Sequence, residues 1–205
     1  MFLSLGETET SVKPDLDSLA TALYVGFGDL LKQSPQLAPW RPSVGIAPKL
    51  SDAELVTPAV LQALLGFTSE RRWIRHARAH LRHLFPYLPM ALGYNKRLRK
   101  AAALLQQAIR LLAIYATLWN LRLLRPARES EGERPGAPML KPLRQVIESI
   151  NETFKGRLDL ERHRGRTPSG VIARVLQRVL TLTAAIWHND HTGQPVKRAL
   201  TAYDH

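Results

Sequence analysis

The sequence contains no cysteine, which excludes disulfide bonds and zinc sites with cysteine ligands. It also lacks an uncharged apolar run of the roughly 20 residues that cross a membrane. Arg110 interrupts the apolar stretch 101–119, and Arg174 and Arg178 interrupt the stretch 171–187. We therefore expect buried helices of a soluble protein and no membrane partner. Residues 1–18 have neither a basic start nor a continuous apolar segment, so we expect no signal peptide and a cytoplasmic location.

Acidic residues are scarce relative to basic ones, because the 205 residues include 29 Lys and Arg but 17 Asp and Glu, for a net charge of +12. The basic excess begins after the first 50 residues and is largest in residues 51–100. A basic central and C-terminal portion favours a polyanion as the partner, most often nucleic acid. The alternative that composition leaves open is a basic soluble protein without such a partner.

The spacing of apolar residues predicts a mainly α fold with at most one or two short strands. Apolar residues recur at helical spacing in six segments, at about 15–32, 52–65, 70–84, 95–119, 141–155 and 168–188. Residues 121–124 are a candidate strand, residues 128–138 a charged loop rich in Gly and Pro, and residues 189–205 a polar, frayed tail. This pattern divides the chain into an N-terminal helical domain (1–119), a linker (120–138) and a C-terminal helical piece (139–205).

Capping residues mark the starts of several of these helices. Ser51 and Glu54 have the spacing of a capping box, in which each side chain accepts a hydrogen bond from the other residue's backbone N–H. Asp15 and Thr167 are candidate N-caps, and Thr68 or Ser69 takes that place in the third helix. Pro58 lies inside the second helix and removes one backbone hydrogen bond, so we expect a kink there.

The third helix is strongly basic. Its arginines recur every three or four residues and form one cationic stripe, and a second basic cluster begins the long helix that follows. Two short helices joined by a tight turn at Gly66 resemble a helix-turn-helix, in which the second helix enters the major groove of DNA. The alternative is a solvated charged face. The candidate DNA contacts in these two clusters are Arg71, Arg72, Arg75, Arg78, Arg82, Lys96, Arg97, Arg99 and Lys100.

Histidines on the third helix have the spacing of metal ligands, at positions 76, 80 and 83. The arginines beside them would repel a divalent cation, and no nearby carboxylate completes a ligand set. We therefore expect these histidines to touch phosphates or to pack against neighbouring side chains.

The segment 143–155 carries one acidic and one basic residue on the same helical face. Glu148 and Lys155 are seven residues apart, and Arg144 and Asn151 flank the same stripe. A carboxylate for a divalent cation, followed by a lysine for the adjacent phosphate, suits an enzyme that cuts a phosphodiester. On spacing alone the pattern is weak, because Glu and Lys on a solvated helical face are ordinary and explain it better.

Long stretches of the chain resemble the DDE transposases of bacterial insertion sequences, specifically the nine-eighty-two family in its actinobacterial form. The matching stretches cover most of the chain: 16–24, 44–48, 50–56, 59–69, 71–89, 93–100, 121–151, 158–163 and 187–205. The resemblance implies an RNase H-like core in which two aspartates and a glutamate hold two Mg²⁺ ions. It also implies double-stranded DNA at the inverted-repeat ends of the element as the partner, and it leaves homo-oligomerisation open.

By the same resemblance, Glu148 corresponds to the third acid and metal ligand, and Lys155 to the basic residue that follows it. Arg144 and Asn151, which flank the same stripe, are candidate DNA contacts. The chain departs from the family at the other two acids. The family's first aspartate lies in an Asp-Ser-Thr-Pro-Val strand, and its second aspartate is followed by lysine and asparagine. The sequence contains neither segment. Trp119-Asn120 runs directly into Leu121, so the resemblance implies that most of the expected sheet is missing at this junction, either through an internal deletion or because the reading frame is mis-joined there.

One carboxylate holds too little negative charge for two metal ions, so the resemblance predicts a transposase relative without strand-transfer activity. Two alternatives stay open. The chain is a non-enzymatic DNA-binding protein that competes with intact transposase, or it is a decayed reading frame without a function. The C-terminal apolar stripes, 143/147/150/154 and 175/176/179/182/186, normally pack on the missing sheet. We expect them to pack on each other or on the long helix, or to remain exposed.

Overall fold

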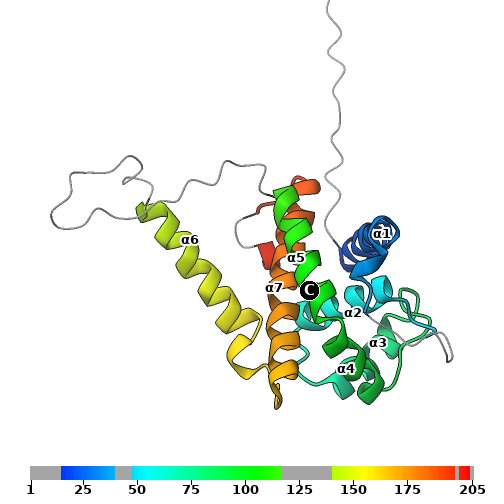
Figure 1. Cartoon of the computed structure of the whole chain (residues 1–205). Coiled ribbons are helices and arrows are strands. Elements are labelled where there is room, and N and C mark those ends of the chain that lie inside the picture. Colours follow the sequence, from blue (N-terminus) through cyan, green and yellow to red (C-terminus); the bar gives the residue numbers. More distant parts are fainter. Residues whose placement is uncertain (1–14, 40–47, 117–139, 197–198, 204–205) are drawn as a thin grey trace, which may run out of the picture.

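A computed structural model describes residues 15–39, 48–116, 140–196 and 199–203 (Figure 1). The described residues form seven α-helices, several short helical turns and no strand, so the prediction of a mainly α fold is confirmed. The α-helices are α1 (Leu16–Gln33), α2 (Asp52–Leu64), α3 (Glu70–His80), α4 (Ala91–Lys100), α5 (Ala102–Ala116), α6 (Leu140–Glu152) and α7 (Pro168–His191). The turns are η1 (Pro35–Leu37), η3 (Thr153–Arg157), η4 (Leu160–Arg162) and η5 (Ala199–Tyr203). The candidate strand at 121–124 and the loop at 128–138 lie outside the described residues.

Helix α7 lies at the centre of the packing. It runs beside α5 on one side and contacts α2 on the other, while α1 packs against α2 (Figure 1). One continuous set of buried apolar side chains joins α1 through α5 to α7, and its largest fully buried members include Trp73 and Tyr94. The C-terminal helix is therefore part of the same core as the helices before residue 116.

The predicted caps are present in the structure. Asp15, Ser51 and Thr167 accept hydrogen bonds from the backbone N–H three residues later, and Ser51 and Glu54 form the expected capping box. Ser69 caps α3. Helix α2 continues through Pro58, which is buried together with almost the whole helix. The position of α2 between α1 and α7 explains why even its turn at Pro58 is covered.

Three predicted helices have different limits in the structure. Helix α3 ends at His80 because the chain turns at Leu81, which lets Leu81, Phe85 and Leu88 reach the core. The predicted helix 95–119 is two helices, which meet at Ala101, a fully buried residue in a turn. The bend lets Tyr94 and Leu98 face the core from α4 while α5 packs along α7.

The third difference is at the end of α6, where the α-helix stops at Glu152 and five residues form a π-helical turn, η3. Helix α6 projects away from the other helices in Figure 1 and reconnects through η3 to the start of α7. Ile150 and Phe154 pack against the core, whereas Val146 and Ile147 are exposed, Ile147 by 57%. The apolar stripe of α6 is thus covered only at its C-terminal end.

Helix α7 packs along α5, the long predicted helix, which is one of the expected outcomes for its apolar stripe, but it buries polar as well as apolar residues. Arg174, Gln177, Arg178 and Thr181 are buried, while Val175, Leu176 and Val179 are only half-buried. Three of these polar side chains donate hydrogen bonds to backbone carbonyls of other segments. Gln177 Nε2 donates to Ala59 O (2.7 Å), Thr181 Oγ1 to Val60 O (3.2 Å) and Arg178 Nε to Leu158 O (2.8 Å).

The C-terminal tail is not frayed over residues 199–203, so that prediction was wrong. Ala199, Leu200 and Tyr203 are buried against the end of α7. Asn189 Nδ2 donates to Ala199 O (2.9 Å), and the Tyr203 hydroxyl lies 2.8 Å from His188 Nδ1. These buried contacts compensate for the lack of long apolar runs in the tail.

Helix α7 is also the one element of the described residues that is long and apolar enough to span a membrane. Its buried arginines and its contacts with α2 and α5 are those of a core helix in a soluble protein.

Candidate nucleic-acid interface

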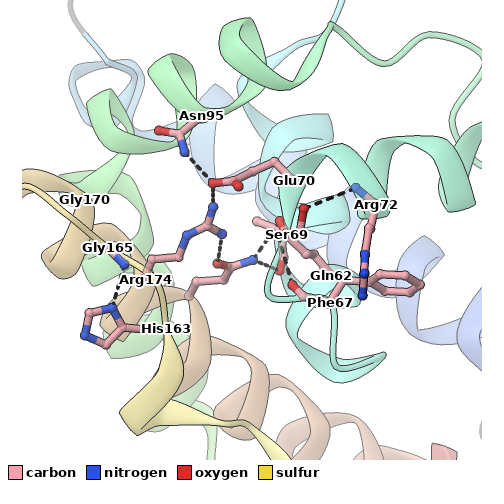
Figure 2. A network of polar contacts seen from close by, with 12 residues as sticks. Gln62, Phe67, Ser69, Glu70, Arg72, Asn95, His163, Gly165, Gly170 and Arg174 are labelled. Atoms are coloured by element: carbon pink, nitrogen blue, oxygen red, sulfur yellow. Dashed lines mark hydrogen bonds and ion pairs between the residues drawn. The ribbon is translucent and has the colours of Figure 1, made fainter.

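A buried polar network joins α3, α4 and α7 (Figure 2). Glu70, in the first turn of α3, forms an ion pair with Arg174 of α7 and accepts a hydrogen bond from Asn95 of α4. The Arg174 side chain is 6% exposed and that of Glu70 is 21% exposed. Burial lowers the pKa of Arg174 to about 10, with a further contribution from Arg178, which still leaves Arg174 charged at neutral pH.

The network continues from Arg174 into the centre of the core. Arg174 Nη1 donates to Gln177 Oε1 (2.7 Å), Gln177 Nε2 lies 3.2 Å from Gln62 Oε1, and Gln62 Nε2 donates to Phe67 O (3.1 Å). The turn between α2 and α3 is thereby tied to α7. Networks of satisfied buried polar groups hold the elements that carry them in one arrangement, so the mutual positions of α3, α4 and the start of α7 are fixed.

The loop at 163–167 places two further arginines beside these helices. The Gly165 N–H donates to His163 Nδ1 (2.9 Å), and a Cβ on Gly165 would lie 2.7 Å from the backbone N of Val171. Only glycine fits this close approach to α7. Arg164 has φ of 58°, a left-handed conformation that is unfavourable for a residue with a Cβ and is often found at functional sites.

Two adjoining hollows lie between these elements, and we call them together the arginine groove. The first hollow, of about 460 Å³, lies between α3, α4, the loop and the start of α7. The second, of about 690 Å³, lies between α3 and the start of α4, and both are lined by Arg71, Ala91 and Leu92. The arginines that line the groove, apart from the buried Arg174, are Arg71, Arg75, Arg78, Arg99, Arg164 and Arg166.

The groove carries an excess of positive charge. Glu70 is the acidic residue in its lining, and its charge is offset by Arg174. Over the described ranges, Arg71, Arg75, Arg99, Arg164 and Arg166 form no ion pair. The exposed apolar side chains of Met90 (70%) and Leu92 (81%) stand beside these arginines. The lining therefore combines cations that lack protein counter-ions with apolar surface.

The structure separates the predicted DNA contacts into several groups. Arg71, Arg75 and Arg78 of α3 line the groove with Arg99 of α4. Arg72, Lys96 and Lys100 are exposed but are not part of its lining, and Arg82 lies in the turn after α3, so it does not continue the helical stripe as predicted. Arg78 is held in place by a hydrogen bond from its Nη2 to Leu88 O (2.6 Å).

Arg97 is occupied by contacts within the protein. Its guanidinium pairs with Asp52 (2.9 Å) and donates to Leu50 O (2.6 Å), with a side-chain exposure of 21%. It fixes the start of α2 against α4 and is less available to DNA than Lys96. Arg99 differs in that its Nε is buried without a hydrogen-bond partner in the part of the chain that the structure describes.

Arg164 and Arg166 were missed as candidate contacts. Their signal in the sequence is the basic segment 162–166, immediately before the N-cap Thr167. Such a segment is unremarkable in a chain with 29 basic residues. Its position beside Arg71 and Arg99 follows only from the packing of α7 in the core.

Glu148 and Lys155 are not brought together. Glu148 Oε1 accepts a hydrogen bond from Arg144 Nε (3.0 Å), and both side chains are largely exposed. Lys155 lies in the π-helical turn, where the prediction of a continuous α-helix fails, and pairs with Glu161 (3.6 Å). Asn151 is exposed on α6. Over the described residues, no three His, Asp or Glu side chains gather as a metal site.

The histidines of the third predicted helix also fail to gather as metal ligands. The His76 ring stacks near Phe67 (4.8 Å between centroids) and His80 (4.7 Å). Burial lowers the pKa of His76, and the neighbouring His80 adds to this. His83 lies in the turn after α3, 3.2 Å from Asp17 of α1. Two of the three histidines thus pack against rings, which is one of the two predicted roles.

Comparisons of the chain with family models, with curated proteins and with solved structures gave no match.

Proposed function

We propose that this protein binds double-stranded DNA through the arginine groove. The observation that carries the proposal is the alignment of unpaired arginines along one groove whose walls are fixed by the Glu70–Arg174 network. Guanidinium groups bind phosphate oxygens in a bidentate way, and a row of them on connected helices suits the regular phosphates of a duplex. The net charge of +12 would draw the protein to the nucleoid of a bacterial cell.

We further propose that the chain is a relative of the insertion-sequence transposases of the nine-eighty-two family that has lost strand transfer. The support is the resemblance of the long stretches described above, together with the absence from the sequence of the family's Asp-Ser-Thr-Pro-Val segment. In this proposal α2 and α3 form the helix-turn-helix, and α6 is a remnant of the RNase H-like domain. The inverted-repeat ends of the element are then the preferred DNA.

The pairing of Glu148 with Arg144 supports an inactive catalytic remnant. A guanidinium beside the carboxylate offsets the charge that a metal ion would require. The exposed position of both side chains gives them the freedom to separate, but separation leaves a single carboxylate. Two-metal chemistry on phosphodiesters needs several acidic ligands about both ions.

A gel-shift titration over a range of salt concentrations tests DNA binding. The logarithm of the association constant should fall linearly with the logarithm of the salt concentration, by about 0.9 per phosphate contacted. The double variant Arg71→Ala/Arg75→Ala should bind at least about tenfold more weakly and lower the slope by about 2. Arg110→Ala is the matched control, because Arg110 is exposed on α5 and does not line the groove.

The same assay separates the proposal from its alternatives. Tighter binding to inverted-repeat DNA than to an unrelated duplex supports descent from a transposase that recognises these ends. Equal binding to both duplexes supports a non-specific DNA-binding protein and contradicts recognition of the ends. The absence of a shift at low salt contradicts DNA binding and supports a decayed reading frame.

A further inference from the structure

The first hollow of the arginine groove differs from the second in having walls from three parts of the chain. Arg71 comes from α3, Arg99 from α4, and Arg164 and Arg166 from the loop before α7. In Figure 2, Gly165 and Gly170 lie on the α7 side of the Arg174 guanidinium, while Glu70 and Asn95 lie on its other side. The start of α7 therefore forms one wall of the hollow. None of the DNA contacts predicted from the sequence lies on α7 or on the loop before it.

Four arginines that form no ion pair with the described residues line this hollow, which suggests an anionic ligand, and three further observations concern how they are held. Arg99 reaches the lining of the hollow, and its buried Nε forms no hydrogen bond with the described residues. Arg164 is kept in a left-handed conformation although it carries a full side chain. The loop is pressed against α7 at Gly165, so the two loop arginines are held beside a helix N-terminus, which favours negative charge.

The buried ion pair underneath removes the main objection to this site. A carboxylate in the lining would repel an anion, but Glu70 is bound by Arg174 and Asn95. The remaining charged groups of the lining are Arg71, Arg99, Arg164 and Arg166. The volume of about 460 Å³ exceeds what one phosphate needs, so the hollow has room for a phosphate with its attached sugar.

We infer that this hollow binds a phosphate group of DNA, with Arg164 and Arg166 as contacts from the C-terminal part of the chain. The inference rests on the proposed function and extends it, because DNA would be held between α3 and the loop before α7. The second hollow, with Arg75 and Arg78, would bind the neighbouring phosphates along the same groove. The C-terminal part thus contributes to binding although its candidate catalytic residues do not assemble.

The test uses the full chain and a double variant, Arg164→Asn/Arg166→Ala. Asparagine tolerates the left-handed backbone at position 164, and both side chains are exposed, so the fold should persist, as circular dichroism would show. We expect DNA affinity to fall by about tenfold and the salt slope to fall by about 2. The Arg110→Ala control should leave both unchanged. An unchanged slope in the loop variant overturns the inference, while the wild-type shift still supports the proposed function.

A variant with unchanged net charge tests whether DNA binding depends on the positions of the loop arginines or only on their charge. Gly165→Ala keeps every arginine but forces the loop away from Val171. If the two loop arginines act as placed contacts, DNA binding weakens by several-fold at an unchanged net charge. Wild-type affinity in this variant would overturn the placement. The hollow could instead bind a free phosphate compound, and calorimetry with inorganic pyrophosphate tests this. If the wild type binds pyrophosphate but does not shift DNA, and the loop variant binds neither, the hollow is a phosphate site. That result overturns DNA as its ligand.

Discussion

Glu70 and Arg174 form an ion pair that connects the first turn of α3 to α7, and Asn95 of α4 donates to the same carboxylate. The pair lines the first hollow of the arginine groove and links helices that are far apart in the sequence. It is nearly buried on the Arg174 side, where an unpaired guanidinium would be strongly unfavourable.

The first prediction concerns this pair. Glu70→Gln should lower the free energy of unfolding by about 3–5 kcal/mol, because it leaves Arg174 buried without a counter-charge. The double variant Glu70→Gln/Arg174→Met should recover much of that loss, since the buried charge is gone. Urea denaturation followed by circular dichroism measures both. A double variant no more stable than the single variant would contradict this account.

Arg97 and Lys96 are neighbours in sequence with different expected roles. Arg97→Ala removes the ion pair with Asp52 and the bond to Leu50 O, so we expect a loss of stability of about 2 kcal/mol. Lys96→Ala removes an exposed side chain and should change stability by less than about 0.5 kcal/mol. Thermal denaturation of the two variants side by side checks the contrast. Equal melting temperatures would show that the Arg97 contacts do not contribute.

His188 should make stability depend on pH. Burial lowers its pKa below the usual 6.5, with His191 adding to this and Asp15 opposing it. A lowered pKa in the folded state means that the unfolded chain binds the proton more tightly. The stabilisation is therefore complete above about pH 6.5, the unfolded pKa, and is lost as the pH falls through the folded pKa. The free energy of unfolding should decrease as the pH is lowered from 7.5 to 5, and it should decrease less in His188→Gln.

His76 should contribute in the same direction, because burial also lowers its pKa. His76→Gln is therefore the companion variant, and its free energy of unfolding should also fall less than that of the wild type over this pH range.

The packed tail gives a further prediction. Tyr203→Phe keeps the ring but removes the hydroxyl that lies 2.8 Å from His188 Nδ1 and donates to Asn189 Oδ1 (3.1 Å). We expect a loss of about 1–2 kcal/mol, because Asn189 and His188 are left with buried, unsatisfied polar atoms. Chemical denaturation of the variant tests this, and stability equal to that of the wild type would indicate that the tail is loosely held in solution.

Glu148 provides a test on the catalytic side. We expect no Mg²⁺-dependent nicking of supercoiled DNA by the wild type, and the same result for Glu148→Gln. The substitution should change stability by less than about 1 kcal/mol, because the pair with Arg144 is exposed. Robust nicking by the wild type that disappears in Glu148→Gln would contradict the inactive remnant.

Local signals in the sequence predicted local structure well. The caps at Asp15, Ser51 and Thr167 depend on residues within three positions, so spacing alone identified them. The bend at Ala101 and the end of α3 at His80 could not be predicted in this way. Both depend on which side chains reach the core once α7 is in place, and that is a property of the packed molecule.

The same distinction applies to the candidate site. The arginines of α3 were identified because they share one helical face. Arg164 and Arg166 lie beside these arginines only because of tertiary packing. Arg97 was predicted as a DNA contact, but its guanidinium is bound to Asp52 and Leu50. Helical periodicity treats every exposed position as equivalent, and it contains no information on the partners that a neighbouring element brings.

The central position of α7 has a consequence for how the protein is made. Helices α1 through α5 leave the ribosome before the helix that fills the space between them. Until α7 emerges, the sides of α2 and α5 that pack on α7 have no lasting cover, and the nascent chain is exposed to aggregation or to chaperones during that interval. Ribosomes that stall within the α7 coding region would therefore release chains that cannot close their core, and those chains would be early targets of proteolysis.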